Sequence, residues 1–272
     1  IRPMSQCLIA NNIEGIAGIL NGTTNFILTK MIEDGMTFED ALKLAQDNGF
    51  AEKDPTADIE GFDACRKVCI LASLAFGKHV YPNQVRAEGI TKITLEDVEY
   101  ISSAHGVIKL LGQIKKIDDD KITAFVSPAV VFHGSQLASV NGVFNAILVR
   151  GDAVGDVCFY GAGAGKLPTA SAVVADMVDC AVHVNRRKNF GWGPGSEDYV
   201  VDEKSALEMP FYVRAKATES EAVALFHNVK FLTRTGQPSD EVAFITDSMT
   251  ENALDKKLEG VNVINKIKVT NY

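Results

Sequence analysis

The fold of this chain is decided by two stretches, "KITAFVSPAVVF" at residues 121–132 and "VNGVFNAILVRGDAVGDVCFYG" at residues 140–161. Both are rich in β-branched and aromatic residues, and apolar residues alternate with others along them, a pattern typical of strands. Asn141-Gly142 and the later glycines supply the signals of tight turns. We therefore predict that these residues form antiparallel strands.

Helix and strand patterns also fill the residues before these stretches. In "TFEDALKLAQDNG", Thr37 is the expected N-cap, Asp40 follows three residues later, and Gly49 closes the helix. The other predicted elements are a strand at 13–22, helices at 23–35 and up to Gly77, and a helix followed by a strand at 95–116. We predict an α+β fold in which helices cover an antiparallel sheet.

The C-terminal part of the chain has a different pattern. Residues 207–272 predict strand, helix, strand, strand, helix, strand, and this βαββαβ order is the ferredoxin-like plan. The residues before them mix charge, glycine and proline with little periodicity. We therefore predict one domain at 1–183, a linker at 184–206 and a second domain at 207–272.

Composition and charge exclude several classes of partner. The chain has 272 residues, a net charge of −8 and a pI near 5.2, which argues against nucleic acid or an anionic membrane surface as a partner. No apolar run is long enough to span a bilayer. The five cysteines form no CxxC pair, and we expect them to be reduced and packed in the core of a cytoplasmic protein. The chain starts at Ile1 without Met, so we expect it to come from the middle of a longer protein.

The chemistry is concentrated in "FAEKDPTADIEGFDACRKVCILASLAFG", residues 50–77. Lys67 follows Asp63 by four residues, so the two side chains are neighbours on one helix face. Taken alone, this pattern is typical of a surface ion pair worth about 1 kcal/mol at most. The loop also brings Glu52 and Asp58 to the same helix start, and carboxylates around one lysine suit a zwitterionic substrate and proton transfer. A Mg²⁺ or Ca²⁺ site is the alternative, which a lysine inside the cluster disfavours.

Two glycine-containing turns are further candidates. "NGTTN" at residues 21–25 lies between a predicted strand and a predicted helix, where it could bind a carboxylate or form an N-cap without a ligand. "GAGAGKLPTAS" at residues 161–171 fails both the P-loop pattern and GxGxxG. Gly163 and Gly165 still allow a close backbone approach to a phosphate or a flat ring, and a purely structural turn is the alternative. The five histidines show no ligand spacing, so no metal site is predicted.

Several of these motifs closely resemble the homoserine dehydrogenase family. The resemblance covers residues 1–180 in order and includes "GILNGTTNFILTKM", residues 50–77, "IKLLG" and "LASVNGVFNAILVRGDAVGDVCFYGAGAGKLPTASAVVAD". The family interconverts L-aspartate 4-semialdehyde and L-homoserine with NADP or NAD, on the path to threonine, methionine and isoleucine. The resemblance therefore implies a cytoplasmic oxidoreductase of amino-acid biosynthesis.

The resemblance also implies roles for individual residues. Lys67 matches the catalytic lysine that donates a proton to the aldehyde, and Asp58 matches a further acid that the pocket needs. The matches to substrate-binding positions are Glu52 and Asp63 for the amine and Gly22 and Thr23 for the carboxylate; those to cofactor-binding positions are Gly49, Gly163 and Gly165. Phe50 departs from relatives that have Tyr there.

The family begins with a dinucleotide-binding domain that this chain lacks, together with a second substrate lysine and a monovalent-cation site. We therefore expect most of the NADP or NAD site to lie outside the chain, and the chain alone to be inactive. Residues 207–272 resemble an ACT domain, which implies an amino-acid effector. Its usual ligand turn is replaced by "TESEAVA", residues 218–224, so a structural or dimerising role is an alternative. The resemblance implies a homodimer or higher homo-oligomer. An amino-acid-binding regulatory protein without catalysis is the second functional hypothesis, and another semialdehyde dehydrogenase fits the motifs less well.

Overall fold

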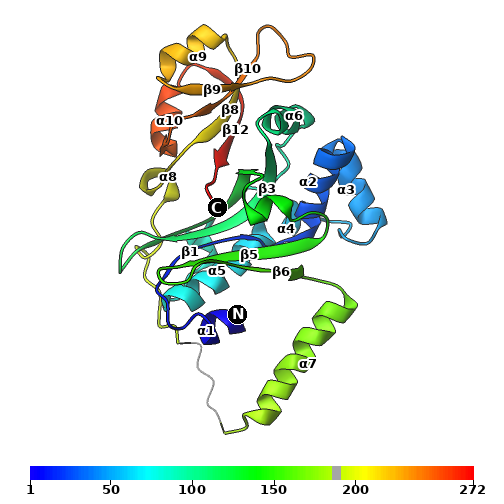
Figure 1. The fold of residues 1–272 in the computed structure, drawn as a ribbon, viewed down its shortest axis with the longest axis vertical. Helices are drawn as coiled ribbons and strands as arrows, with labels where there is room; N and C mark the ends of the chain where they lie inside the picture. Colours follow the sequence, from blue (N-terminus) through cyan, green and yellow to red (C-terminus); the bar gives the residue numbers. More distant parts are fainter. Residues whose placement is uncertain (186–190) are drawn as a thin grey trace.

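The computed structural model describes residues 1–185 and 191–272 and is built around one large sheet (Figure 1). Among these residues the sheet has ten strands in the order β6-β5-β1-β3-β4-β12-β8-β10-β9, with β2 paired to β4. The strands are β1 (Ile13–Ile19), β2 (Arg86–Ala87), β3 (Gly106–Lys116), β4 (Ile122–Phe132), β5 (Phe144–Gly151), β6 (Gly155–Ala162), β8 (Phe211–Lys216), β9 (Val229–Leu232), β10 (Val242–Thr246) and β12 (Asn262–Val269). A separate two-stranded sheet consists of β7 (Glu208–Met209) and β11 (Met249–Thr250).

The predicted antiparallel strands are confirmed, and they form two hairpins. β3 and β4 pair antiparallel along their full length, from Gly106 opposite Phe132 to Lys116 opposite Ile122. β5 and β6 pair from Phe144 opposite Ala162 to Gly151 opposite Gly155. Both hairpins follow from β-branched residues that pack on a pleated surface, and Gly155, with φ of +72°, closes the turn between β5 and β6.

Helices accompany the sheet in a mixed α/β fold. They are α1 (Arg2–Gln6), α2 (Gly22–Asp34), α3 (Phe38–Asp47), α4 (Thr56–Ile59), α5 (Phe62–Phe76), α6 (Leu95–Ser103), α7 (Lys166–Val182), α8 (Glu203–Ala206), α9 (Glu219–Leu225) and α10 (Glu251–Lys257), with 3₁₀ turns η1 (Pro82–Gln84) and η2 (Gln136–Ser139). Thr37 caps α3 by accepting a hydrogen bond from the Asp40 N–H at 3.1 Å, as expected. No helix among residues 1–185 and 191–272 is long and apolar enough to cross a membrane.

Close packing of α5 on the sheet depends on Gly112. A Cβ atom at this position of β3 would lie 2.5 Å from Val68 of α5 and 2.7 Å from Leu20. Glycine therefore lets α5 approach the backbone of β3, where Val68 is fully buried. The same approach brings the start of α5 next to the end of β1, where the candidate site lies.

The expectation that all five cysteines lie in the core is corrected. Cys65 and Cys69 of α5 are buried, but Cys7, Cys158 and Cys180 are exposed, so only two cysteines lie in the core; all five are free thiols. The helix after "GAGAG" is α7, which stands apart from the sheet in Figure 1 and exposes apolar side chains. None of the α7 residues is buried by the described part of the chain.

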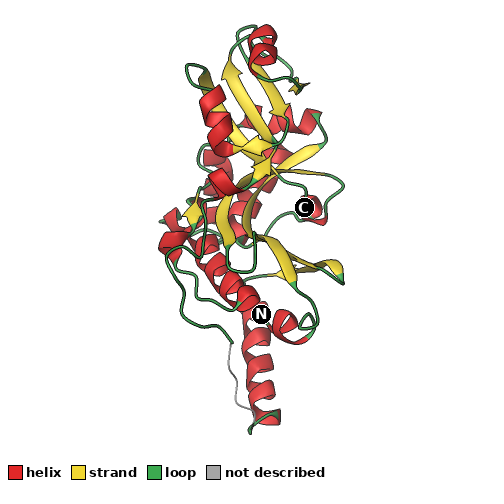
Figure 2. Cartoon of the chain, turned by 90° about the vertical axis from the view of Figure 1, so that its left-hand side faces the viewer, coloured by secondary structure: helices red, strands yellow, loops and turns green. Residues whose placement is uncertain are grey.

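The C-terminal part has the predicted element order but is joined to the first sheet. The order is β8, α9, β9, β10, α10, β12, and β12 also pairs with β4, Lys268 opposite Ala129. This contact is parallel, as is that between β2 and β4, so the sheet is only mostly antiparallel. In the side view the strands continue from the upper, C-terminal part into the middle of the molecule (Figure 2). The predicted linker lies partly outside the described residues, and the domain boundaries stay a prediction.

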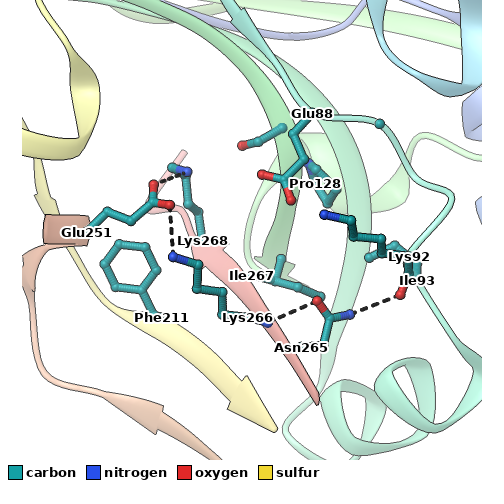
Figure 3. Close-up of a pocket in the computed structure, with 12 residues that line it drawn as sticks. Glu88, Lys92, Ile93, Pro128, Phe211, Glu251, Asn265, Lys266, Ile267 and Lys268 are labelled. Atoms are coloured by element: carbon teal, nitrogen blue, oxygen red, sulfur yellow. Dashed lines mark hydrogen bonds and ion pairs between the residues drawn. The ribbon is translucent and has the colours of Figure 1, made fainter. Parts of the chain in front are cut away.

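A buried carboxylate holds the C-terminal part against the sheet. Glu251, at the start of α10, forms ion pairs with four cations: Arg86 at 3.0 Å, Lys204 at 3.3 Å, Lys266 at 3.1 Å and Lys268 at 2.7 Å. Figure 3 shows Lys266 and Lys268 directed at this carboxylate from β12. Burial alone would raise the pKa of Glu251, but Lys268, Arg86 and Lys266 outweigh it and hold this pKa well below its usual range.

A buried lysine lies on the sheet face away from α5. The Lys109 side chain is fully buried, and its Nζ donates to the Val140 carbonyl at 2.6 Å, to Asn141 Oδ1 at 3.1 Å and to Asn25 Oδ1 at 3.2 Å. These acceptors are neutral, and burial lowers the pKa of Lys109 to about 8, although Glu33 opposes the change. The folded state therefore releases this proton at a lower pH than the unfolded state does.

This lysine should make stability rise with pH. The Lys109 pKa is about 8 in the folded chain against 10.5 when exposed, so above pH 8 the unfolded state binds more protons. Relative to Lys109→Met, we expect the free energy of unfolding of the wild type to increase by about 2 kcal/mol between pH 7 and pH 9.5. Urea unfolding of both proteins at the two pH values measures this. Equal pH dependence in the two proteins would show that Lys109 keeps an ordinary pKa.

Candidate active site

The site begins at the turn between β1 and α2. Asn21 is the N-cap of α2, and its Oδ1 accepts a hydrogen bond from the Thr24 N–H at 2.9 Å. The next residue has no room for a side chain, because a Cβ on Gly22 would lie 2.8 Å from the Val143 carbonyl oxygen. The turn thus leaves the first backbone N–H groups of α2 without intrahelical partners, as a helix start does.

Lys67 is held next to this turn. Its Nζ donates to the Leu20 carbonyl oxygen at 2.9 Å and to Asp63 Oδ2 at 2.7 Å. The Asp63 contact is the predicted i, i+4 pair within α5. The Lys67 side chain is 46% exposed and that of Asp63 is 30% exposed. The described residues therefore leave this lysine partly exposed to solvent.

Asn21 joins the two acids. Its Nδ2 donates to Asp58 Oδ1 at 2.7 Å and to Asp63 Oδ2 at 2.9 Å. Asp58 comes from the short helix α4 and Asp63 from the first turn of α5, so one amide connects α2, α4 and α5. We call Asn21, Asp58, Asp63 and Lys67 the lysine–carboxylate cluster.

The loop that carries Glu52 is tied to the same turn. Thr23 Oγ1 donates to the Phe50 carbonyl at 2.7 Å, and Gln46 Nε2 donates to the Glu52 carbonyl at 3.1 Å. Within the described residues the Glu52 carboxylate forms no hydrogen bond or ion pair, so it is available to a ligand. Gly49 has φ of +73°, and a Cβ on it would meet no heavy atom within 4 Å, so its backbone borders open space.

The second glycine turn lies near the first. A Cβ on Gly163 would lie 2.2 Å from Asn145 Nδ2, and a Cβ on Gly22 would lie 3.6 Å from Asn145 Oδ1. Asn145 of β5 therefore lies between the two turns. Gly165, with φ of +115°, follows as the N-cap of α7. The close approach that we predicted at Gly163 is thus made, within this chain, to the Asn145 side chain.

The structure therefore assembles most, but not all, of the predicted residues. Asp58, Asp63 and Lys67 form hydrogen bonds to Asn21 and Leu20 of the β1–α2 turn, where Gly22 and Thr23 also lie, and Glu52 lies on a loop bonded to Thr23. The sequence prediction missed the structural roles of two residues. Asn21 had a signal, as an N-cap before Gly-Thr-Thr, whereas Asn145 had none.

The arrangement offers one place for each end of an amino acid. Carboxylates of Asp58, Asp63 and Glu52 can accept hydrogen bonds from an ammonium group, and the N-terminus of α2 can bind a carboxylate. Lys67 can donate a proton to an oxygen between them. In the part of the chain that the structure describes, no group of three or more His, Cys, Asp or Glu side chains is arranged to hold a metal ion. Fold and site together define a mixed α/β protein whose lysine–carboxylate cluster has groups suited to a small zwitterion.

Comparison with known proteins makes the assignment specific. The family model for homoserine dehydrogenase matches residues 1–178. The homoserine dehydrogenase of Pseudomonas aeruginosa is 42% identical over 229 residues, which are 82% of this chain and 52% of that protein. That of Synechocystis is 46% identical over 183 residues, 66% of this chain and 42% of that protein. This chain belongs to the homoserine dehydrogenase family, and it spans about half the length of these curated relatives.

Solved structures agree with this assignment. The crystal structure of a homoserine dehydrogenase from Thiobacillus denitrificans matches with a TM-score of 0.85 and 33% identity, over 99% of this chain and 67% of that one. A hyperthermophilic archaeal homoserine dehydrogenase mutant in complex with NADPH matches with a TM-score of 0.56 and 31% identity, over 66% of this chain and 51% of that one. The first match extends through the C-terminal part, whereas the second covers two thirds of the chain.

Proposed function

We propose that this chain is the substrate-binding and proton-transferring part of a homoserine dehydrogenase, which interconverts L-aspartate 4-semialdehyde and L-homoserine. The observation that carries the proposal is the position of Lys67. Its Nζ is fixed by Asp63 and the Leu20 carbonyl, beside the start of α2 and a second carboxylate, Asp58. Family membership supplies the reaction, and this cluster supplies groups suited to it.

Each residue then has a defined task. Asp63 and Glu52 bind the substrate ammonium, with Asp58 beside them, and the backbone N–H groups of Gly22 and Thr23 bind the carboxylate. Lys67 donates a proton to the aldehyde oxygen as the carbonyl carbon is reduced, and accepts it back in the reverse reaction. The hydride comes from NADPH or NADH when the cofactor is bound.

Three glycines are suited to contact with that cofactor. Gly49 borders open space with a positive φ, and Gly163 and Gly165 form a turn at the start of α7. Backbone without side chains permits the close approach that a phosphate or ring needs. These residues supply one edge of a cofactor site. These three glycines do not include the residues that select NADP over NAD.

For the C-terminal part, we propose an ACT-like domain. The order β8, α9, β9, β10, α10, β12 and the antiparallel pairing of β8 with both β10 and β12 support a ferredoxin-like plan. An amino-acid effector is the ligand that such a domain implies. A structural or dimerising role is the alternative, and the cytoplasm is the location that free cysteines favour.

The proposal is tested by joining this chain to a nucleotide-binding domain of the family. We expect that fusion to oxidise NADPH when aspartate 4-semialdehyde is added, and the chain alone to show no turnover, because the hydride donor lacks most of its site. A fusion that binds both ligands without turnover would favour the regulatory hypothesis. NADPH oxidation by the chain alone would contradict the proposed division of the active site.

A further inference from the structure

The Asn21 side chain uses every hydrogen-bonding position that an amide has. Its Nδ2 donates to Asp58 Oδ1 at 2.7 Å and to Asp63 Oδ2 at 2.9 Å. Its Oδ1 accepts from the Thr24 backbone N–H at 2.9 Å and from Thr24 Oγ1 at 3.1 Å. An amide has two N–H donors and one oxygen with two lone pairs, so the set is complete. The Thr24 N–H fixes which end is oxygen, and the side chain is buried.

We propose that Asn21 is a positioning residue that holds Asp58 and Asp63 at a fixed separation and ties both to the N-terminus of α2. The inference rests on the proposed function. Through Asn21, the carboxylates that bind the substrate ammonium and the helix start that binds the substrate carboxylate form one unit. Substrate is then bound at both ends by groups whose spacing is set before it arrives.

Electrostatics explain why an amide is needed between these acids. Two carboxylates that approach the same point repel each other, and the repulsion favours protonation of one of them. Two N–H donors from one neutral group offset this repulsion and leave the other carboxylate lone pairs for an ammonium. Helix capping by itself would not require asparagine, because aspartate and serine cap helices about as well.

Asn21 also acts on Lys67 through a shared atom. Asp63 Oδ2 accepts from both Asn21 Nδ2 and Lys67 Nζ, at 2.9 and 2.7 Å. Asn21 therefore fixes the oxygen that the lysine contacts. The Leu20 carbonyl, one residue before Asn21, fixes the same Nζ from the turn. Displacement of the amide would move the proton donor as well as the substrate-binding acids.

The test compares Asn21→Asp with Thr24→Val in the fusion with a family nucleotide-binding domain. Asn21→Asp keeps a capping oxygen but loses both N–H donors and adds a third carboxylate. Thr24→Val perturbs the same amide from its other side and leaves both donors in place. We expect Asn21→Asp to lower kcat/KM for L-homoserine about 100-fold, the loss typical of a misplaced reacting group. We also expect the acid limb of the pH profile of kcat/KM for Asn21→Asp to move to higher pH by about one unit, because the added carboxylate favours protonation within the acid cluster.

A purely structural role would give a different pattern. Asn21→Asp and Thr24→Val would then lower the melting temperature alike, and the acid limb would stay in place in both; this result would overturn the inference. Asn21→Ser, which caps the helix without two donors or added charge, should also lose kcat/KM but shift the acid limb less. If Asn21→Asp fails to fold, Asn21→Ser serves as the test instead. A kcat/KM of Asn21→Ser equal to that of the wild type would overturn the inference. An inactive wild-type fusion would instead overturn the proposed function.

Discussion

Lys67→Ala lowers kcat for L-homoserine oxidation about 1000-fold in a protein that joins this chain to a nucleotide-binding domain of the family; this is the result we expect. The magnitude is that of losing a positioned general acid–base. Because Lys67 is bound to Asp63 and to a backbone carbonyl at the surface of α5, its removal should leave the fold intact. Steady-state rates and far-UV circular dichroism measure the two effects separately.

The chain contains a matched control for this experiment. Lys30 and Asp34 form an i, i+4 ion pair at 2.8 Å on α2, comparable with the 2.7 Å pair of Lys67 and Asp63. Lys30→Ala should leave kcat unchanged, because this pair lies at the end of the helix away from the site. If Lys67→Ala were as active as Lys30→Ala, Lys67 would have no part in proton transfer and the regulatory hypothesis would gain support.

Glu251→Gln has the largest expected effect on stability, a loss of about 3–5 kcal/mol in the free energy of unfolding. Glutamine keeps the shape of the side chain but removes the charge that four cations face. Lys268, only 5% exposed, would then be a buried cation without a carboxylate partner at 2.7 Å. Urea unfolding at pH 7 measures the loss.

An exposed ion pair in the C-terminal part of the chain provides the control for Glu251→Gln. Asp240 pairs with Lys216 at 3.0 Å, but its side chain is 70% exposed, so Asp240→Asn should destabilise the protein far less than Glu251→Gln does. The Glu251 pKa is lowered, so the contribution of Glu251 is present at neutral pH and is lost as the pH falls below 4.5. Equal losses for the two variants would show that burial adds nothing to the Glu251 cluster.

Local patterns predicted most of the elements, because their signals lie within a few residues of one another. The cap at Thr37 and the turn at Gly142 act on their own neighbours, and both elements form as expected. The pairing of β12 with β4 joins Lys268 to Ala129, residues that no local pattern relates. Lys268 of β12 is buried against the Glu251 carboxylate of α10, a contact between distant residues that no local pattern indicates.

In the candidate site, as in the fold, contacts within one helix were predictable and contacts between distant residues were not. Asp63 and Lys67 share a helix face, so their contact followed from spacing alone. The roles of Glu52 and Gly49 came from family resemblance, and the structure adds only that their loop is bonded to Thr23. Asn145 could not be predicted, because an asparagine within a strand pattern carries no local signal for a contact with two distant glycine turns.

The position of β12 in the sheet has a consequence for biosynthesis. This strand lies between β4 and β8, yet both of these strands precede it in the sequence. During translation, both of its neighbours leave the ribosome before it does, and each exposes unpaired backbone groups where β12 later binds. Completion of the sheet therefore waits for residues 262–269, and nascent chains that end earlier carry two edges open to aggregation.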